Sequence, residues 1–430
     1  MINRIRIAKG GAALAVALVA LAACNREDPN KLVGDSKPVT VCPPSGNAGA
    51  TGTSSSGSTS TSTSGSMTTS SGSVVVDEGL AQREVDYLEA LRTAALKIVG
   101  NVPTLAEMES VRTASDQKAA YETQIDLYMA DPRFANRMVE FWKNTMRSAN
   151  ATANQMPSLD SAPLFAARVT VEGLNFTTLF TAETNSCPTF DAATGKFSDG
   201  DCPPNGPMTA GVLTNQGLLS HYFGPLGFRR VRFFQEVFAC SKMPAEWTTP
   251  QDLPGGGTYT SPWPFESIAG LSNGGRIDFL DHSSSVCANC HTTINHRVPL
   301  WARYDANGAY VEPVGTGQDM EFAVLAPLPG TPPAKLSDYL PAGQNTAWKV
   351  NMPASNIKEL GQAMANDEEV QSCAVRRMWN YAMSKGDIVY DVSPVPMSVI
   401  EPLFADFKAS GFDLKKTIRS IFVHEDFVRY

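Results

Sequence analysis

Two cysteines and a histidine stand close together in the stretch HSSSVCANCHTTINHR, residues 282–297. Cys287 and Cys290 are two residues apart in a CxxC pair, and His291 follows the second cysteine directly. Thiols at this spacing on one helical turn can reach both vinyl groups of a single porphyrin, and the adjacent imidazole can then bind the iron. The spacing therefore predicts one covalent haem c, with His291 as the proximal iron ligand.

Two other kinds of site use a CxxC pair. A structural zinc site needs two further Cys or His ligands at local spacing, and a redox dithiol of the thioredoxin type needs a strand–turn–helix context. His296 is available as one more ligand, but the sequence contains no second CxxC pair. The pattern around Cys287 also lacks the strand–turn–helix context, so haem attachment is favoured.

The second axial position on the iron has two rival candidates. Met352 stands in VNMPAS, and this Met-Pro pair resembles the distal ligand of small cytochromes c, whereas His221 stands in LLSHYFG. Met352 is also one of 15 methionines that could simply pack a core. A lone histidine near apolar residues is more often satisfied by a backbone carbonyl. His296 is only five residues from His291 and is poorly placed to reach the opposite haem face. The sequence leaves Met352 and His221 as alternatives.

The N-terminus predicts export and lipidation. Residues 1–23 combine a basic start with a short apolar run, which suits a secretory signal and is too short for a permanent membrane span. The run ends in LAAC, which resembles the lipobox of bacterial lipoproteins and implies cleavage before a lipidated Cys24. The alternative is an ordinary cleaved signal peptide with a chance cysteine. Asn25, in place of an aspartate, favours an outer-membrane lipoprotein of a Gram-negative bacterium, facing the periplasm or the cell surface.

A tether is expected next. Residues 43–73 are almost wholly Ser, Thr and Gly, without aromatic or charged side chains. Such a segment cannot bury enough apolar surface to offset the entropy lost on ordering. Residues 24–74 are therefore expected to form a lipidated, disordered tether or, alternatively, an O-glycosylated stalk.

The remaining cysteines suggest disulfides, because an exported chain meets an oxidising compartment. Cys187 and Cys202 flank a polar loop that a disulfide would staple, and Cys240 and Cys373 could form a second, long-range bridge. Cys42 is left over. Sequence alone does not prove these pairings.

Helical signals dominate after the tether. Thr104 followed by Glu107 is a capping-box pattern, Gly100 is a natural helix stop, and Asp131-Pro132 separates two amphipathic stretches. No sustained alternating strands are visible. We predict a mostly α protein, with a helical cytochrome c-like haem domain embedded in a larger helical body with long loops. The expected segments are the signal peptide (1–23), the tether (24–74), an N-terminal helical domain (75–184), a loop-rich segment with helices (185–264) and a haem c-binding helical domain (265–430).

The charge balance bears on partners. The formal net charge is −8, and loss of the three basic residues of the signal would make it −11. No basic patch or arginine-rich run is present, which argues against nucleic acid as a partner. The membrane is expected to be contacted through the lipid anchor.

The chain from about residue 80 to 430 resembles the planctomycete-type cytochrome c proteins, which are large secreted haem-c proteins of uncharacterised function. The resemblance implies haem c and export more than it implies a reaction. One departure is Asn295 to Val298, where the family usually has an Asp-Pro-x-Gly turn. The matching stretches are LRTAALKIVGNVPTLAEM, YMADPRFANRMVEFW, GVLTNQGLLSHYFGPLGFRRVRFFQEVFAC, CANCHTTINHRVPLWARYDANGAY, EVQSCAVRRMWNYAMSKG and FKASGFDLKKTIRSIFVHEDF.

Three functions follow as hypotheses. The first is an outer-membrane-anchored monohaem c-type cytochrome that transfers single electrons between a donor and an acceptor protein. The second is a haem c-dependent redox enzyme, of the oxidase or peroxidase type, with an extracellular substrate. The third is a surface-binding lipoprotein in which the haem is structural. The sequence favours an electron carrier over an enzyme and identifies no catalytic residue.

Overall fold

The computed structural model describes the main part of the chain after the expected tether. The described residues are 82–148, 158–224, 227–242, 251–252, 258–259, 293–322, 333–386, 395 and 397–430. They belong to one compact unit that spans residues 75–430. The expected signal peptide, Cys24, Cys42, the expected tether and the CxxCH motif lie outside the described residues.

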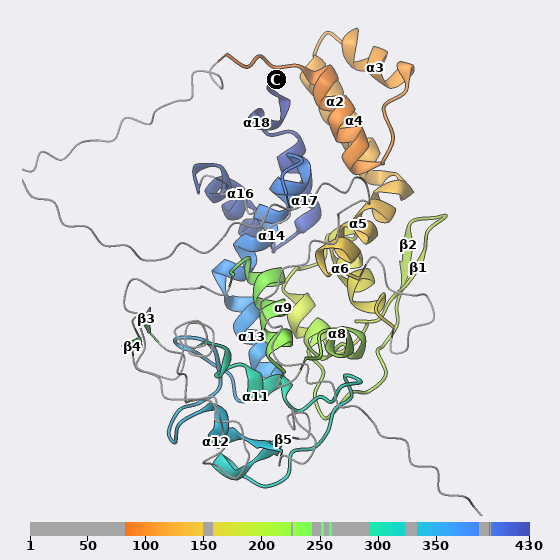
Figure 1. Ribbon diagram of the computed structural model, residues 1–430. Helices are drawn as coiled ribbons and strands as arrows, with labels where there is room; N and C mark the ends of the chain where they lie inside the picture. Colours follow the sequence, from red (N-terminus) through yellow and green to blue (C-terminus); the bar gives the residue numbers. More distant parts are fainter. Residues whose placement is uncertain are drawn as a thin grey trace, which may run out of the picture. The chain divides into compact units, whose positions relative to one another are not determined.

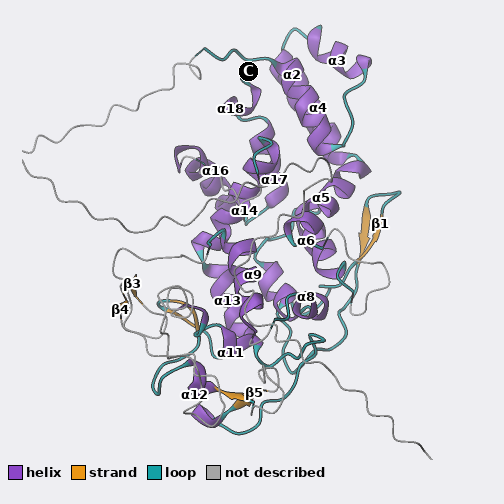
Figure 2. Cartoon of the chain, viewed as in Figure 1, coloured by secondary structure: helices purple, strands orange, loops and turns teal. Residues whose placement is uncertain are grey.

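Helices dominate the described residues, and the mostly α prediction is confirmed (Figure 2). The strands found there are two or three residues long and pair only as antiparallel two-stranded ribbons. No helix in the described ranges is long and apolar enough to cross a bilayer.

The N-terminal helices begin and end where local side chains dictate. They are α2 (Tyr87–Ile98), α3 (Leu105–Arg112), α4 (Gln117–Ala130), α5 (Pro132–Thr145), α6 (Ser161–Val171) and α7 (Thr178–Thr181). Thr104 and Glu107 form the predicted capping box at the start of α3. Asp131 ends α4 and caps α5, because its side chain accepts from the Arg133 amide and Pro132 takes the first helical position.

The central part alternates short elements with one long helix. Its elements are β1 (Thr189–Asp191), β2 (Lys196–Ser198), η1 (Gly211–Thr214), α8 (Gln216–His221), α9 (Phe228–Ala239), β3 (Gln251–Asp252) and β4 (Thr258–Tyr259). Helix α9 buries most of its aromatic side chains, and Phe234 stacks on Trp301 with ring centroids 4.7 Å apart. These aromatic residues therefore form core.

The C-terminal part supplies the remaining elements. They are α11 (Val298–Trp301), η4 (Gly317–Asp319), β5 (Glu321–Phe322), β6 (Ala334–Lys335), α12 (Leu336–Tyr339), β7 (Ala347–Lys349), β8 (Met352–Pro353), α13 (Ile357–Asn366), α14 (Glu368–Ala382), α16 (Met397–Ala409), α17 (Leu414–Phe422) and α18 (Glu425–Val428).

Helix α14 is the helix around which the C-terminal part is built (Figure 1). It contacts α9, α13, α16 and α17, and residues on all sides of it are buried. A helix that is buried all round lies in a core rather than on a surface. Its first turn carries Asp367 as N-cap, and this residue also takes part in the candidate site.

Both predicted disulfides are present. Cys187 and Cys202 join the two sides of the β1–β2 hairpin region, with an S–S distance of 2.01 Å. Cys240, at the end of α9, bonds to Cys373 in α14 across 133 residues of sequence, with an S–S distance of 1.99 Å. The second bridge links two helices that pack against each other in the core.

The two ends of the described unit meet. The Glu84 amide donates to Tyr430 O at 3.2 Å, and the Tyr430 amide donates back to Glu84 O at 3.0 Å. A buried hydroxyl also links distant elements: Tyr121 Oη in α4 donates to Phe422 O in α17 at 2.6 Å. Helices α2, α4 and α17 are thereby held together with the C-terminus.

Candidate functional site

The predicted haem-attachment residues Cys287, Cys290 and His291 lie outside the described residues. The description resumes at residue 293, two positions after His291. The surroundings of the motif can therefore be described from the segment that follows it. Within the described ranges, no group of three or more His, Cys, Asp or Glu side chains is placed to hold a metal ion.

Directly after the motif, the chain turns and binds a hairpin. The Arg297 amide donates to Ile294 O at 2.9 Å, which closes the turn, and the Ala347 amide donates to His296 O at 3.1 Å. Ala347 begins β7, and β7 pairs antiparallel with β8 so that Lys349 lies opposite Met352. One candidate distal ligand, Met352, is thus carried by a hairpin bound to the residue five positions after His291.

Met352 itself is half-buried and packs against the hydrophobic core. A thioether in that setting can serve as ordinary packing or as a soft ligand for iron. The residues described here therefore keep both interpretations of this methionine open.

His296 is a buried histidine with a backbone partner. Its Nδ1 lies 3.0 Å from Asn345 O. Because a carbonyl oxygen only accepts hydrogen bonds, Nδ1 must carry the proton. Burial lowers the pKa of His296, with the Arg297 charge acting in the same direction and the Asn345 contact opposing both. The side chain is therefore neutral at pH 7 and fixes the turn to the loop before β7.

Arg297 is a buried cation beside this turn. Its Nε donates to Trp348 O at 2.7 Å, and its Nη1 donates to Gln235 Oε1 of α9. The guanidinium carbon lies 4.3 Å from the centroid of the Trp348 ring, which is a cation–π contact. Burial lowers the pKa of Arg297 to about 10, and the negative charges of Glu369 and Asp367 oppose that shift. The side chain stays charged at neutral pH.

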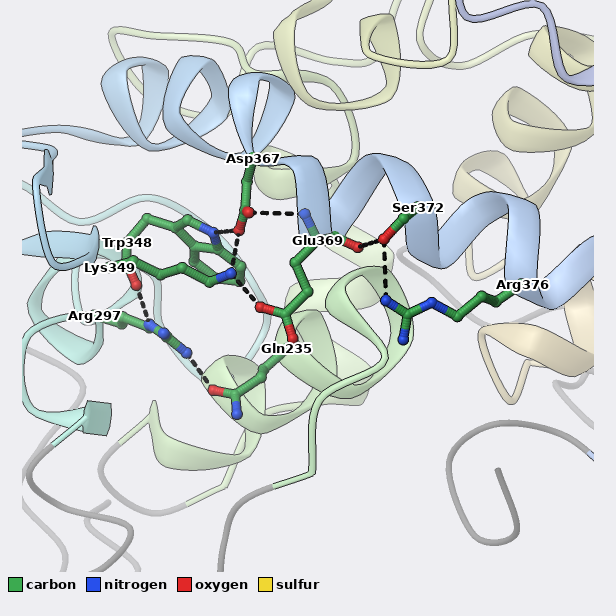
Figure 3. Close-up of polar contacts among 8 residues, drawn as sticks. All are labelled: Gln235, Arg297, Trp348, Lys349, Asp367, Glu369, Ser372 and Arg376. Carbon is green, nitrogen blue, oxygen red and sulfur yellow. Dashed lines mark hydrogen bonds and ion pairs between the residues drawn. The ribbon is translucent and has the colours of Figure 1, made fainter. Parts of the chain in front are cut away.

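A second cation, Lys349, belongs to the same set of polar contacts (Figure 3). Lys349 Nζ lies 2.7 Å from Asp367 Oδ2 and also pairs with Glu369. Asp367 Oδ2 accepts from Trp348 Nε1 at 2.7 Å, while Oδ1 accepts from the Glu369 amide at 3.0 Å and caps α14. Each of these buried or half-buried charges has a partner, so the cluster is electrically balanced.

We call this set the Arg297 cluster; it consists of Gln235, Arg297, Trp348, Lys349, Asp367 and Glu369. It joins the turn after the motif to α9, β7 and the start of α14. The cluster can hold the turn after the motif and the Met352 hairpin in one fixed arrangement. Of these residues, only Arg297 stood out in the sequence, as part of the departure at 295–298 from the family pattern. In the sequence, the acidic residues that follow Asp367 indicate the start of a helix, but they do not indicate that this helix start lies near Arg297.

His221, the other candidate distal ligand, lies at the end of α8 and is half-buried. Burial lowers the pKa of His221, and the charge of Arg229 lowers it further. Its ring makes an edge contact with Tyr222, with centroids 4.8 Å apart. The ring is therefore neutral at pH 7, as an iron ligand must be.

Helix α8 is linked through Arg230 to a later part of the chain that follows the motif. Arg230 Nε donates to Leu219 O at 2.8 Å, and its Nη1 donates to Tyr304 O at 2.6 Å. The Met352 hairpin instead bonds at residue 296. The two candidate ligands thus lie on different elements, and each element is anchored to the chain that follows the motif.

Comparison with known proteins gives one match. Residues 76–163 match a family model named PSCyt2, described as a protein of unknown function (DUF1549). The matched range includes helices α2 to α5 and the beginning of α6, and it ends well before the CxxCH motif. No curated protein and no solved structure matches the chain. The match therefore relates the N-terminal helices to a family without assigning them a chemistry.

Proposed function

We propose that this protein is a monohaem c-type cytochrome, anchored by lipid to the outer membrane, that transfers single electrons. The observation that carries the proposal is the Cys287-Ala-Asn-Cys290-His291 motif in a chain whose N-terminal residues predict export. Two thiols and an imidazole at this spacing form the donor set of haem c. When bound, the haem supplies a one-electron redox couple.

The flanking structure supports the proposal through the chemistry of nearby side chains. The turn after the motif is fixed by Arg297, and the hairpin bound to it carries the Met352 thioether. A methionine ligand raises the reduction potential relative to a histidine. We therefore favour Met352 over His221 as the second ligand, because its hairpin bonds directly to the residues next to the motif.

The roles of the chain follow from this assignment. Cys287 and Cys290 would hold the haem covalently, and His291 and Met352 would bind the iron. One haem carries one electron at a time, so the protein needs a donor and an acceptor protein. The lipid on Cys24 and the Ser/Thr/Gly segment would keep the folded unit near the membrane while it meets both partners.

The first test is the mass of the full chain, matured in a host that attaches haem c. Intact-protein mass spectrometry under denaturing conditions should show one added tetrapyrrole, and Cys290→Ala should reduce the covalently bound fraction. A chain that matures with both sulfurs free and no added mass would end the proposal.

The second test concerns the iron ligand. Met352→His should lower the reduction potential, and Met352→Ala should let carbon monoxide bind to the reduced protein. His221→Ala removes the rival ligand and should leave the visible spectrum unchanged. Met320→Ala is the matched control, because Met320 is another partly buried methionine that packs against the core, and it should also leave the spectrum unchanged. Carbon monoxide binding by His221→Ala, with an unchanged Met352→Ala spectrum, would assign the ligand to His221 instead.

A further inference from the structure

The hairpin formed by β7 and β8 has a two-residue turn whose second residue adopts a left-handed backbone conformation. Lys349 lies opposite Met352 in this hairpin, so Val350 and Asn351 form the turn. Asn351 has a φ of +62°, whereas Val350 has no positive φ. A turn that requires a positive φ at its second central residue favours Gly or Asn at that place. Asn351 therefore suits the position directly before Met352.

The backbone of Met352 is restricted from both sides. The left-handed Asn351 precedes it, and Pro353 follows it, which biases Met352 toward an extended conformation. The amide of the next residue, Ala354, donates to Thr346 O at 3.0 Å, and this contact continues the pairing beyond β8. The direction in which the Met352 side chain leaves the backbone thus depends on the turn.

The residue opposite Met352 is held by charges at the start of α14. Lys349 Nζ lies 2.7 Å from Asp367 Oδ2 and also pairs with Glu369 (Figure 3). The Asp367 side chain is 7% exposed and caps α14, so this ion pair joins the hairpin to a core helix. A movement of the hairpin away from α14 would separate a largely buried charge from its partner, which is costly.

The strand that carries Lys349 is also bound to the chain after the CxxCH motif. The Ala347 amide donates to His296 O at 3.1 Å, and Arg297 Nε donates to Trp348 O at 2.7 Å. The hairpin is therefore held by α14, by the turn after the motif and by its own tight turn. A ligand on an element held in this way can keep one defined orientation.

We propose that Asn351 and Lys349 are positioning residues that keep the Met352 thioether in place as the second iron ligand. This inference rests on the proposed function and adds the residues that maintain the ligand. Asn351 acts through the backbone conformation of the turn, and Lys349 acts through its ion pairs with α14. If either contribution is lost, Met352 should leave the iron more often.

Cyanide binding by the oxidised full chain with its haem attached measures how firmly Met352 is held. Cyanide can bind opposite His291 only when Met352 has left the iron, so its apparent affinity rises in proportion to the population of that open state. Met352→Ala removes the ligand outright and should give the highest cyanide affinity of the series.

Two substitutions of Asn351 separate backbone conformation from side-chain loss. Asn351→Gly permits the left-handed conformation and should keep the cyanide affinity of the parent. Asn351→Val places a β-branched residue there, and because a left-handed L-residue disfavours the turn about tenfold, cyanide affinity should rise about tenfold. The matched control is Asn185→Val, since Asn185 is also exposed and has a φ of +57° outside the hairpin. It should lower the thermal unfolding temperature to a similar degree but leave cyanide affinity unchanged.

A substitution of Lys349 tests the ion pairs. Lys349→Gln removes the charge and should raise cyanide affinity about fivefold, since a charge-assisted contact that favours the closed hairpin is lost. The matched control is Lys335→Gln in β6. The Lys335 side chain is 28% exposed, against 30% for Lys349, and it also contacts two carboxylates, those of Asp319 and Glu321. This control should bind cyanide like the parent.

Two results would overturn the inference and leave the proposed function intact. In the first, Asn351→Val and Lys349→Gln bind cyanide like the parent although Met352→Ala binds it more tightly. In the second, Asn185→Val shows the same rise as Asn351→Val, which would reveal a general loosening of the fold. Parental cyanide affinity in Met352→Ala would instead refute the methionine ligand, and the positioning roles with it.

Discussion

Two buried arginines hold the chain after the CxxCH motif, and both donate to backbone carbonyls. Arg230 donates to the carbonyls of Leu219, Trp301 and Tyr304, while Arg297 donates to Trp348 O and to the side chain of Gln235. Burial lowers the pKa of each to about 10, so both remain charged at neutral pH. A planar guanidinium with several fixed donors suits this task better than an ammonium.

The geometry of Arg297 predicts that lysine cannot replace it. Arg297→Lys keeps the charge but loses at least one donated hydrogen bond and the contact of the guanidinium with the Trp348 ring. We expect the free energy of unfolding to fall by about 2 kcal/mol, measured by urea denaturation. The control is Arg112→Lys in an exposed pair on α3, which should change stability by less than about 0.5 kcal/mol. Equal effects of the two substitutions would contradict this role.

His296 predicts a loss of stability on acidification. Its folded pKa lies below the ordinary histidine value of 6.5, so the unfolded chain takes up the proton first as the pH falls. Stability is therefore present in full above pH 6.5 and is lost as the pH falls toward the lowered folded pKa. His221 shifts in the same direction. His296→Gln should leave a smaller drop in unfolding free energy between pH 7 and pH 5 than the parent shows. An identical drop in the variant and the parent would show that His296 does not contribute to the pH dependence of stability.

Among the elements, helix α14 links the Arg297 cluster to helices α5 and α9. Its N-cap Asp367 belongs to the Arg297 cluster, and Asn380 and Tyr381 near its C-terminal end line a cavity beside α5. Between them, Cys373 bonds to Cys240 at the end of α9. Arg377, one turn further along, donates to two carbonyls of the last turn of α9. Helices α9 and α14 are therefore held together by covalent and charged contacts.

The two disulfides should differ in their contribution to stability. Cys240–Cys373 closes 133 residues of sequence, and Cys187–Cys202 closes 15. Because a longer closed loop restricts the unfolded chain more, the long-range bridge should contribute more to stability, about 5 kcal/mol against about 3 kcal/mol. Denaturation of the two Cys→Ser double variants measures both values. A larger loss from the short-range pair would show that native-state effects outweigh loop entropy.

At the level of the whole molecule, residues 75–430 form one compact unit whose described ends pair with each other. The division of this unit at residues 184 and 264 stays a prediction, as do the tether and the lipid anchor. The core runs through the unit, since helices from the N-terminal, central and C-terminal parts contact one another. If the protein is a lipid-anchored electron carrier, this unit would meet its donor and its acceptor as one folded domain.

The proposed lipid anchor predicts where the protein is found after cell fractionation. Cys24→Ser removes the thiol that would carry the acyl chain, so the variant should lose membrane attachment and appear in the soluble fraction. Cys42→Ser is the matched control, because it removes a nearby cysteine and should stay with the membrane. Membrane retention of both variants, without acyl labelling of the parent, would contradict lipidation.

The sequence by itself determined features that depend on neighbouring residues. The capping box at Thr104, the break at Asp131-Pro132 and the mostly α class were predictable, because caps and helix breaks are fixed within four positions. The CxxCH motif is also a pattern of contiguous residues, and its assignment to haem c stays a prediction. The two disulfides were predicted as candidate pairings that the sequence could not prove, and the structure shows both.

Only the tertiary structure decided which distant residues meet. Arg297 finds Trp348 and Gln235 some fifty to sixty positions away, and Asn380 lines a cavity with Phe141 more than two hundred positions earlier. Burial and pairing of such residues depend on the path of the chain, which no local pattern encodes. The same reason explains why the sequence left Met352 and His221 as rivals. The choice between them stays a proposal, and it rests on the hairpin bonded to His296 O.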